Sequence, residues 1–257
     1  MEMIRTEIHN AVAIVTLNRP EARNALTSGM LRDLSDIMTN LDEDDAIRCV
    51  ILTGADPAFC AGLDLKDLAN TYNGATNRTT SDGEIRGLMP VMATPVIGAV
   101  NGPAVTGGLE LALACDFLIA SDRATFADTH GRVGIMPGGG MSIRLPQLVG
   151  LNRARQMSLT GNFLDAQTAC DWGLANEVVP HEELMSRALA LGATISENDP
   201  ATMRELLEMY SAFGHRGDEE SFREESRWSR RWMRERFDEQ RFESQRDGII
   251  ERGSQQQ

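Results

Sequence analysis

The chain lacks the features that would point to nucleic acid or a membrane. Its 257 residues include 25 Lys and Arg but 38 Asp and Glu, and the net charge of -13 argues against nucleic acid as a partner. No uninterrupted apolar stretch approaches the roughly 20 residues that a membrane-spanning helix requires. The N-terminus has no basic segment followed by an apolar one, so we expect no signal peptide. These absences predict a soluble, cytoplasmic protein without a membrane partner.

Metal-binding and phosphate-binding motifs are also missing. The four cysteines form no CxxC pair, and the four histidines are scattered without ligand spacing, which predicts no metal site. The sequence contains no GxxxxGK[ST] run, which argues against a nucleotide-hydrolysing P-loop. Cys60 stands close to a glycine and could be reactive, but we interpret it as a small packing residue.

Apolar patterning predicts strands and helices in alternation. Residues 4–8 and 12–17 predict a hairpin, and a helix is expected from Thr27 or Ser28 to Leu41. Further strands are expected at 49–53, 96–100, 117–120 and 177–179. Further helices are expected at 65–68, 85–92, 152–159, 165–172 and over most of the chain after 181, with a mobile polar loop at 70–82. This order predicts ββα units and a largely parallel sheet.

The most informative segment is NGPAVTGGLE, residues 101–110. It follows an apolar run and precedes another, so a strand, a glycine-rich turn and a helix start are expected there. The free N–H groups of a helix N-terminus favour negative charge, and Glu110 stands one turn further on. Donors for a developing anion and a candidate base are therefore expected side by side.

A second glycine-containing loop, AFCAGLDL at residues 58–65, also follows a predicted buried strand. Both loops can lie at the same edge of a parallel sheet, where ligands tend to bind. Two N–H groups aimed at one carbonyl oxygen form an oxyanion hole. Close helix–strand packing is the alternative explanation for the paired glycines at 107–108.

These segments together resemble the crotonase (enoyl-CoA hydratase/isomerase) superfamily. The other matching signatures are LNRPEARNAL (17–26), CDFLIA (115–120) and VGIMPGGG (133–140). The resemblance implies an α/β fold, a crotonase-like spiral of ββα units over residues 1–195, with a helical trimerisation region over residues 196–257. It also implies a homotrimer or homohexamer and an acyl-CoA thioester substrate, with coenzyme A as part of the substrate and no separate cofactor.

The resemblance further assigns candidate catalytic residues. The backbone N–H groups of Leu63 and Gly107 would form the oxyanion hole, and Glu110 would be the principal base. Hydratases of the family use two carboxylates around the bound water, and the second position falls on His130. Histidine can also donate or accept a proton near neutral pH. If this piece is extended, Asp128 points the same way and could orient the ring. The alternative is a loop histidine without chemistry.

Binding of coenzyme A is expected to come mostly from loop backbone groups. By resemblance, the candidate positions are Ala22, Arg23, Ala61, Leu63 and Asp64, with Gly108 and Pro137 as further substrate-binding residues. A guanidinium is suited to a phosphate, so Arg23 could meet a phosphate of coenzyme A. A solvated surface arginine is the alternative interpretation.

The leading hypothesis is an enoyl-CoA hydratase-like lyase that adds water across a 2-enoyl-CoA. A double-bond isomerase with Glu110 as single base is the alternative, although isomerases of the family usually keep a carboxylate where His130 stands. A non-catalytic acyl-CoA-binding protein is a third hypothesis. Glu110 beside Gly107 argues against it.

Overall fold

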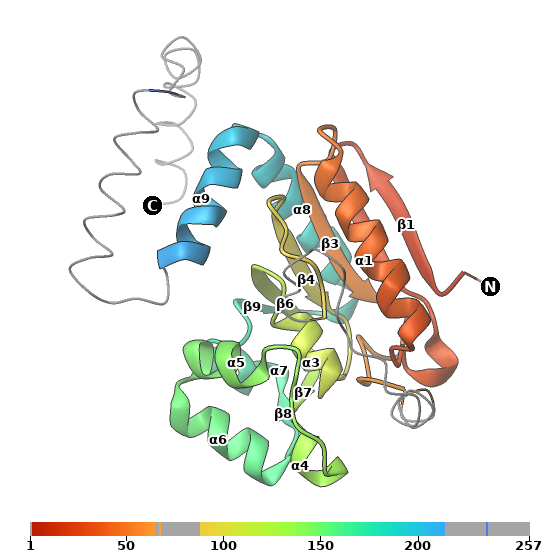
Figure 1. Ribbon diagram of the computed structural model, residues 1–257, viewed down its shortest axis with the longest axis vertical. Helices are drawn as coiled ribbons and strands as arrows, with labels where there is room; N and C mark the ends of the chain where they lie inside the picture. Colours follow the sequence, from red (N-terminus) through yellow and green to blue (C-terminus); the bar gives the residue numbers. More distant parts are fainter. Residues whose placement is uncertain (1, 65–66, 68–87, 214–234, 236–257) are drawn as a thin grey trace. The chain divides into compact units, whose positions relative to one another are not determined.

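Two β-sheets with helices around them form most of the chain that the computed structural model describes, namely residues 2–64, 67, 88–213 and 235 (Figure 1). The chain divides into two units, residues 1–204 and 205–257. Only residues 205–213 and 235 of the second unit are described, so the trimerisation role of the C-terminal region stays a prediction.

The main sheet has six strands in the order β1-β2-β3-β4-β6-β9. Its strands are β1 (Ile4–His9), β2 (Val12–Leu17), β3 (Cys49–Gly54), β4 (Val96–Val100), β6 (Phe117–Ser121) and β9 (Glu177–Val179). The first two strands form an antiparallel hairpin, and every other neighbouring pair is parallel. The predicted hairpin and parallel sheet are therefore confirmed.

A smaller sheet has the strand order β5-β7-β8 and was not predicted. Its strands are β5 (Ala104–Val105), β7 (Thr125–Ala127) and β8 (Leu164–Asp165). Strands of two or three residues are too short to show an alternating apolar pattern. This sheet joins the segment after β4 to the one after β6, and it thereby brings residues 104–110 close to residues 125–130.

Helices cover the sheets and fill the connections. The 3-10 turns are η1 (Pro20–Ala22) and η2 (His181–Glu183). The α-helices are α1 (Ser28–Glu43), α3 (Gly107–Ala112), α4 (His130–Val133), α5 (Met141–Val149), α6 (Leu151–Thr160), α7 (Ala166–Asp171), α8 (Leu184–Ser196) and α9 (Pro200–Phe213). Thr27 caps α1 by accepting a hydrogen bond from the Met30 N–H, as its position predicted.

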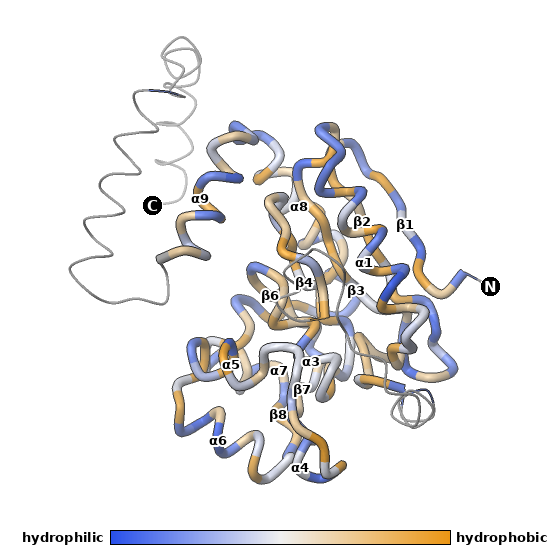
Figure 2. Tube along the Cα trace, viewed as in Figure 1, coloured by the Kyte–Doolittle hydropathy of each residue, from blue (hydrophilic) through white to orange (hydrophobic). Residues whose placement is uncertain are grey.

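Both faces of the central strands β2, β3 and β4 are buried, which explains their continuous apolar runs. Alternate side chains of β2, such as Val15 and Leu17, pack in one cluster with the apolar stripe of α1. The intervening residues Val12 and Ile14 pack in a second cluster with Leu184 and other residues of α8. Figure 2 shows the resulting hydrophobic colouring along the central strands.

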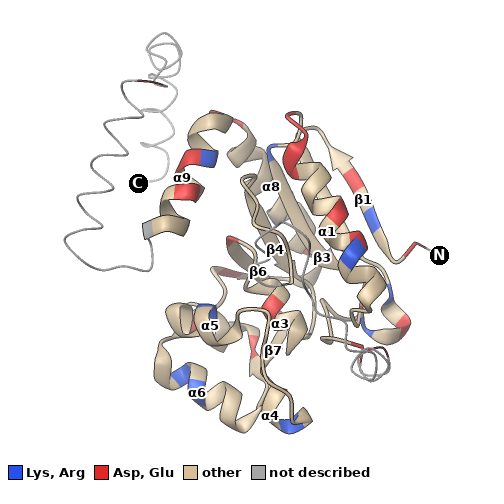
Figure 3. Cartoon of the chain, viewed as in Figure 1, with Lys and Arg blue, Asp and Glu red and all other residues tan. Residues whose placement is uncertain are grey.

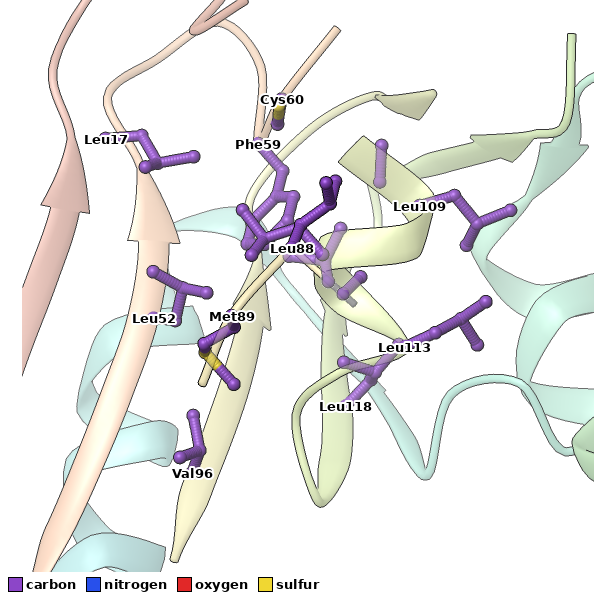
Figure 4. Packing of buried hydrophobic residues seen from close by; sticks show 14 of the residues in the cluster. Leu17, Leu52, Phe59, Cys60, Leu88, Met89, Val96, Leu109, Leu113 and Leu118 are labelled. Atoms are coloured by element: carbon purple, nitrogen blue, oxygen red, sulfur yellow. The ribbon is translucent and has the colours of Figure 1, made fainter. Parts of the chain in front are cut away.

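The expected helix at residues 85–92 is wrong for the part that is described. Residues 88–92 form bends and irregular backbone. Pro90 has no N–H to donate and disfavours a helical conformation of the residue before it, which explains the difference. Leu88 and Met89 instead belong to the same buried hydrophobic cluster as Leu52, Phe59 and Val96 (Figure 4). The predicted helix at 65–68, apart from residue 67, and the predicted loop at 70–82 lie outside the described residues.

No helix of the described residues is long and apolar enough to span a membrane.

Cys60 is fully buried, and burial raises the pKa of its thiol to about 12. A thiol with this pKa is protonated at neutral pH, which agrees with its interpretation as a packing residue.

A buried asparagine fixes the loop after β3. The side-chain amide of Asn24 donates to the carbonyl oxygens of Ala55, Ala58 and Phe59, at 2.8, 2.7 and 3.3 Å. Its side-chain oxygen accepts from the Arg19 N–H at 2.9 Å. Because Asn24 is fully buried, no water can replace these contacts if they are lost.

We expect Asn24→Ala to lower the free energy of unfolding by about 2–3 kcal/mol, because it leaves buried carbonyl groups unsatisfied. Urea denaturation followed by circular dichroism measures the change. Asn40→Ala, at an exposed position of α1, is the matched control and should change stability by less than about 0.5 kcal/mol. Equal stability of both variants would contradict a structural role for Asn24.

Candidate active site

Two loops meet at the carboxyl ends of β3 and β4. Cys60 and Ala104 form an isolated parallel bridge, in which the Cys60 N–H donates to the Pro103 carbonyl at 3.1 Å. The Val105 N–H donates to the Cys60 carbonyl at 2.9 Å. Gly108 packs against the same segment, because a Cβ added to Gly108 would lie 2.0 Å from the Cys60 carbonyl oxygen. The close approach of the loops therefore requires glycine at 108, as the alternative packing interpretation proposed.

The predicted oxyanion residues lie at this junction. A Cβ added to Gly107 would lie 3.3 Å from the Leu63 nitrogen, so the two peptide groups are close neighbours. Gly107 is the first residue of α3, so its N–H has no partner within the helix. Among the described residues, neither this N–H nor that of Leu63 has a hydrogen-bond acceptor. Both donors are thus available to one oxygen atom of a ligand.

Residues with unusual backbone conformations precede both of these N–H groups. Gly62 precedes Leu63 with φ at +102°, a value that side chains rarely permit. Thr106 precedes Gly107 with φ at 54° and ψ at -110°. Its N–H donates to the Ala127 carbonyl at 2.8 Å, and its hydroxyl contacts that of Thr129 at 2.5 Å. Such conformations persist where surrounding contacts hold them, and they cluster at functional sites.

Glu110 lies one helical turn beyond Gly107 and is 3% exposed. Figure 3 shows acidic colouring on α3, the helix that carries Glu110. Its Oε1 accepts from the Gly139 N–H at 2.6 Å and from the Met141 N–H at 3.3 Å. These bonds fix the carboxylate through Oε1. Oε2 takes part in neither of them and can contact other groups. Sequence reasoning located Glu110 but did not identify these backbone donors.

The structure brings His130 to Glu110. The His130 Nε2 atom lies 3.9 Å from the Glu110 Oε2 atom, and both side chains are buried. On the other side of the ring, Nδ1 lies 2.6 Å from Oδ1 of Asp128. The expected extended geometry is wrong, because His130 begins α4. The predicted contact with Asp128 nevertheless forms, because the turn at the helix start folds Asp128 back onto the ring.

One residue of this cluster was missed. Ser158 on α6 donates its hydroxyl hydrogen to Oδ2 of Asp128 at 2.5 Å. It is separated from Asp128 by about thirty positions and belongs to no motif. Its proximity results from the packing of α4 against α6, which a single sequence does not reveal.

Four of the predicted substrate-binding residues also come together. The Ala61 N–H donates to the Arg23 carbonyl at 2.9 Å, and Ala22 precedes Arg23 at the end of η1. Asp64 continues the same loop, and its Oδ2 accepts from the Arg19 guanidinium at 2.6 Å. The Arg23 side chain is exposed. The remaining positions are Gly108, buried in α3, and Pro137, half-buried in the loop that leads to Gly139.

The space between Leu63 and Gly107 provides a test of the two donors. Gly107→Ala would place a methyl group 3.3 Å from the Leu63 nitrogen, where a bound oxygen must approach. We expect kcat/KM to fall by about 10²-fold, the effect typical of losing one oxyanion donor. The melting temperature should change little.

Gly29→Ala in α1 is the control, because its added Cβ would meet nothing closer than 3.6 Å. It should keep the wild-type kcat/KM. Unchanged kinetics in Gly107→Ala would argue against a ligand oxygen between these peptide groups.

Comparisons with known proteins identify the family of this chain. Residues 7–253 match the family model described as enoyl-CoA hydratase/isomerase. A protein named probable enoyl-CoA hydratase 1, peroxisomal, from Arabidopsis thaliana is 39% identical over 188 residues, covering 73% of this chain and 70% of that protein. A probable enoyl-CoA hydratase from Mycobacterium bovis is 40% identical over 204 residues, covering 79% of each chain.

A crystal structure of enoyl-CoA hydratase from Mycobacterium tuberculosis H37Rv matches with a TM-score of 0.76 and 47% identity. The match covers 84% of this chain and 92% of that one. The fold is thus of the crotonase type, as the resemblance predicted. Together with the family model, these similarities place the protein: it belongs to the enoyl-CoA hydratase/isomerase family.

Proposed function

We propose that this protein adds water across the double bond of a 2-enoyl-CoA thioester and forms a 3-hydroxyacyl-CoA. The observation that carries the proposal is the pair of unpartnered N–H groups, of Leu63 and Gly107, beside the buried carboxylate of Glu110. Such donors polarise a thioester carbonyl while the carboxylate accepts a proton. The family membership and the names of the relatives support hydration over double-bond isomerisation.

In the proposed reaction, Glu110 accepts a proton from water while the water oxygen bonds to the β-carbon. The electrons of the double bond form an enolate, whose oxygen accepts hydrogen bonds from the Leu63 and Gly107 N–H groups. The α-carbon then takes a proton from a second acid, for which we propose His130. Water contributes its hydroxyl group to the β-carbon, and the site gives up one proton and gains one.

Recognition of coenzyme A is proposed to involve the loop residues gathered near η1, together with Gly108 and Pro137. The proximity of Ala22, Arg23 and Ala61 supports a continuous binding surface. The exposed Arg23 side chain can reach a phosphate group from that surface.

A homotrimer or homohexamer and a cytoplasmic location complete the proposal. Large apolar side chains on α5 and α6 support association between subunits. The most exposed of them are Ile143, Leu151 and Leu159, at 64, 53 and 85%. Exposed apolar groups gathered on neighbouring helices are typical of protein–protein interfaces.

Crotonyl-CoA provides the direct test of the activity. The wild-type protein should decrease the absorbance of the enoyl thioester, and a 3-enoyl-CoA should give no increase. Glu110→Gln should lower kcat by about 10³-fold, because the amide cannot accept the water proton. Its side-chain oxygen can still accept from Gly139, so the local structure should persist.

Binding of butyryl-CoA, which has no double bond, should remain within about twofold of wild type in Glu110→Gln, since the carboxylate is proposed to act on the proton and not on the CoA group. Glu182→Gln, at an exposed position of η2, is the matched control and should keep full activity. Formation of the conjugated thioester from the 3-enoyl-CoA, without hydration of crotonyl-CoA, would establish isomerisation instead. No reaction with either substrate over a range of chain lengths would overturn both activities.

A further inference from the structure

Asp128 is the acceptor of a buried hydrogen-bond cluster behind His130. Its Oδ1 lies 2.6 Å from the His130 Nδ1 atom and 3.2 Å from the His130 backbone nitrogen. Its Oδ2 accepts the Ser158 hydroxyl at 2.5 Å. Asp128 is 2% exposed, so these three donors take the place of water around its carboxylate. The carboxylate is thereby held in one orientation against the imidazole.

This arrangement determines where the protons of His130 lie. An ionised carboxylate can only accept hydrogen bonds, so the Nδ1 atom beside it must carry a hydrogen. Nε2 is consequently the nitrogen that faces the active site and Glu110. A water oxygen about 2.8 Å from both Nε2 and Oε2 fits between atoms 3.9 Å apart. A reacting atom can therefore contact both groups at once.

The charges around the ring favour a second proton on it. Glu110 from α3 and Asp128 before α4 are the charged groups that contact His130 within the described residues. From α6, the neutral hydroxyl of Ser158 reaches Asp128. Arg132 on α4 turns its guanidinium to the Thr160 carbonyl instead. With a neutral ring, the buried carboxylates of Glu110 and Asp128 would carry two uncompensated negative charges. With an imidazolium, one uncompensated negative charge remains.

We propose that Asp128, oriented by Ser158, is a positioning residue that keeps His130 doubly protonated, so that its Nε2–H is the acid that protonates the α-carbon. The inference rests on the proposed hydration. An ionised Asp128, a protonated His130 and an ionised Glu110 together carry one net negative charge. A pair of carboxylates that shares one proton carries the same net charge and offers the same acid and base.

The proton count balances over one turnover. Glu110 gains a proton from water as the carbon–oxygen bond forms at the β-carbon. The Nε2–H bond of His130 then breaks, and its proton forms the new bond at the α-carbon. Asp128 stays ionised throughout. Glu110 is left neutral with a neutral His130, and transfer of one proton from the carboxyl to Nε2 restores the starting state.

Asp128→Asn tests the inference, because the amide keeps an acceptor for Nδ1 but removes the negative charge. We expect kcat on crotonyl-CoA to fall by about 10²-fold, the lower range for loss of a general acid. KM and butyryl-CoA binding should stay within about twofold, since neither contact involves the substrate. Ser158→Ala should change kcat in the same direction by a smaller factor.

Nitrogen-15 NMR of the imidazole separates this inference from the proposed function, because it requires no turnover. Wild-type protein at pH 7 should show both His130 nitrogens protonated, with the signals assigned by their absence in His130→Gln. In Asp128→Asn, one nitrogen should lose its proton at the same pH. A neutral ring in the wild-type protein would overturn the inference even if Asp128→Asn did not fold.

Asp165→Asn is the matched control. Asp165 also accepts a nearby backbone N–H and a hydroxyl group, both of Thr168, but its side chain is exposed. The Asp165→Asn variant should leave kcat and the imidazole signals unchanged. An Asp128→Asn variant with the wild-type kcat and the wild-type imidazole signals would show that Asp128 only stabilises the loop. Absence of hydration in the wild-type protein, with a protonated His130, would overturn the function but keep the inference about Asp128.

Discussion

The backbone pairing of two loops, residues 58–64 and 101–107, is the constraint on which the rest of the site depends. A short bridge between Cys60 and Ala104 brings them together, and the donors Leu63 and Gly107 lie three positions further along each loop. Hydrogen bonds of peptide groups fix this spacing more rigidly than long side chains could. A pair of donors fixed before the ligand arrives needs little rearrangement as charge develops on an oxygen.

The same loops would be unstable without support from the chain before them. Asn24 holds the carbonyl groups of Ala55, Ala58 and Phe59, and the Leu26 backbone pairs with Gly62 and Asp64. The residues on both sides of Leu63 are thereby paired, while its own N–H has no acceptor among the described residues. An N–H without a partner costs free energy in a partly buried place. The surrounding hydrogen bonds offset this cost, and a bound carbonyl oxygen would remove it.

Much of this architecture could be predicted, because the signals are local. The apolar runs of β2, β3, β4 and β6 indicated a parallel sheet, and the glycine turns beside two of them indicated an oxyanion site with Glu110 nearby. The resemblance to the family then assigned the two donors to Leu63 and Gly107. The short strands β5, β7 and β8 carry no periodic signal. Pro90 prevents helical backbone at residues 88–92, where the neighbouring residues predicted a helix. Residues 139–141 hold Glu110, but nothing in their sequence identifies that contact.

The acid–base cluster shows why the histidine alone was difficult to interpret. A protonated histidine in place of a neutral carboxyl group raises the charge of a buried site by one unit. The site then needs another negative charge nearby, and Asp128 supplies it from two residues earlier in the chain. The sequence contains both residues, but their geometry depends on the turn into α4 and on Ser158 from α6.

Because burial makes an unpaired charge expensive, Asp128 and His130 are more stable together than either residue would be alone. Under the proposed mechanism, this coupling lets a protonated imidazole stand where the resemblance places a second carboxyl group, and the cluster with Glu110 keeps one net negative charge.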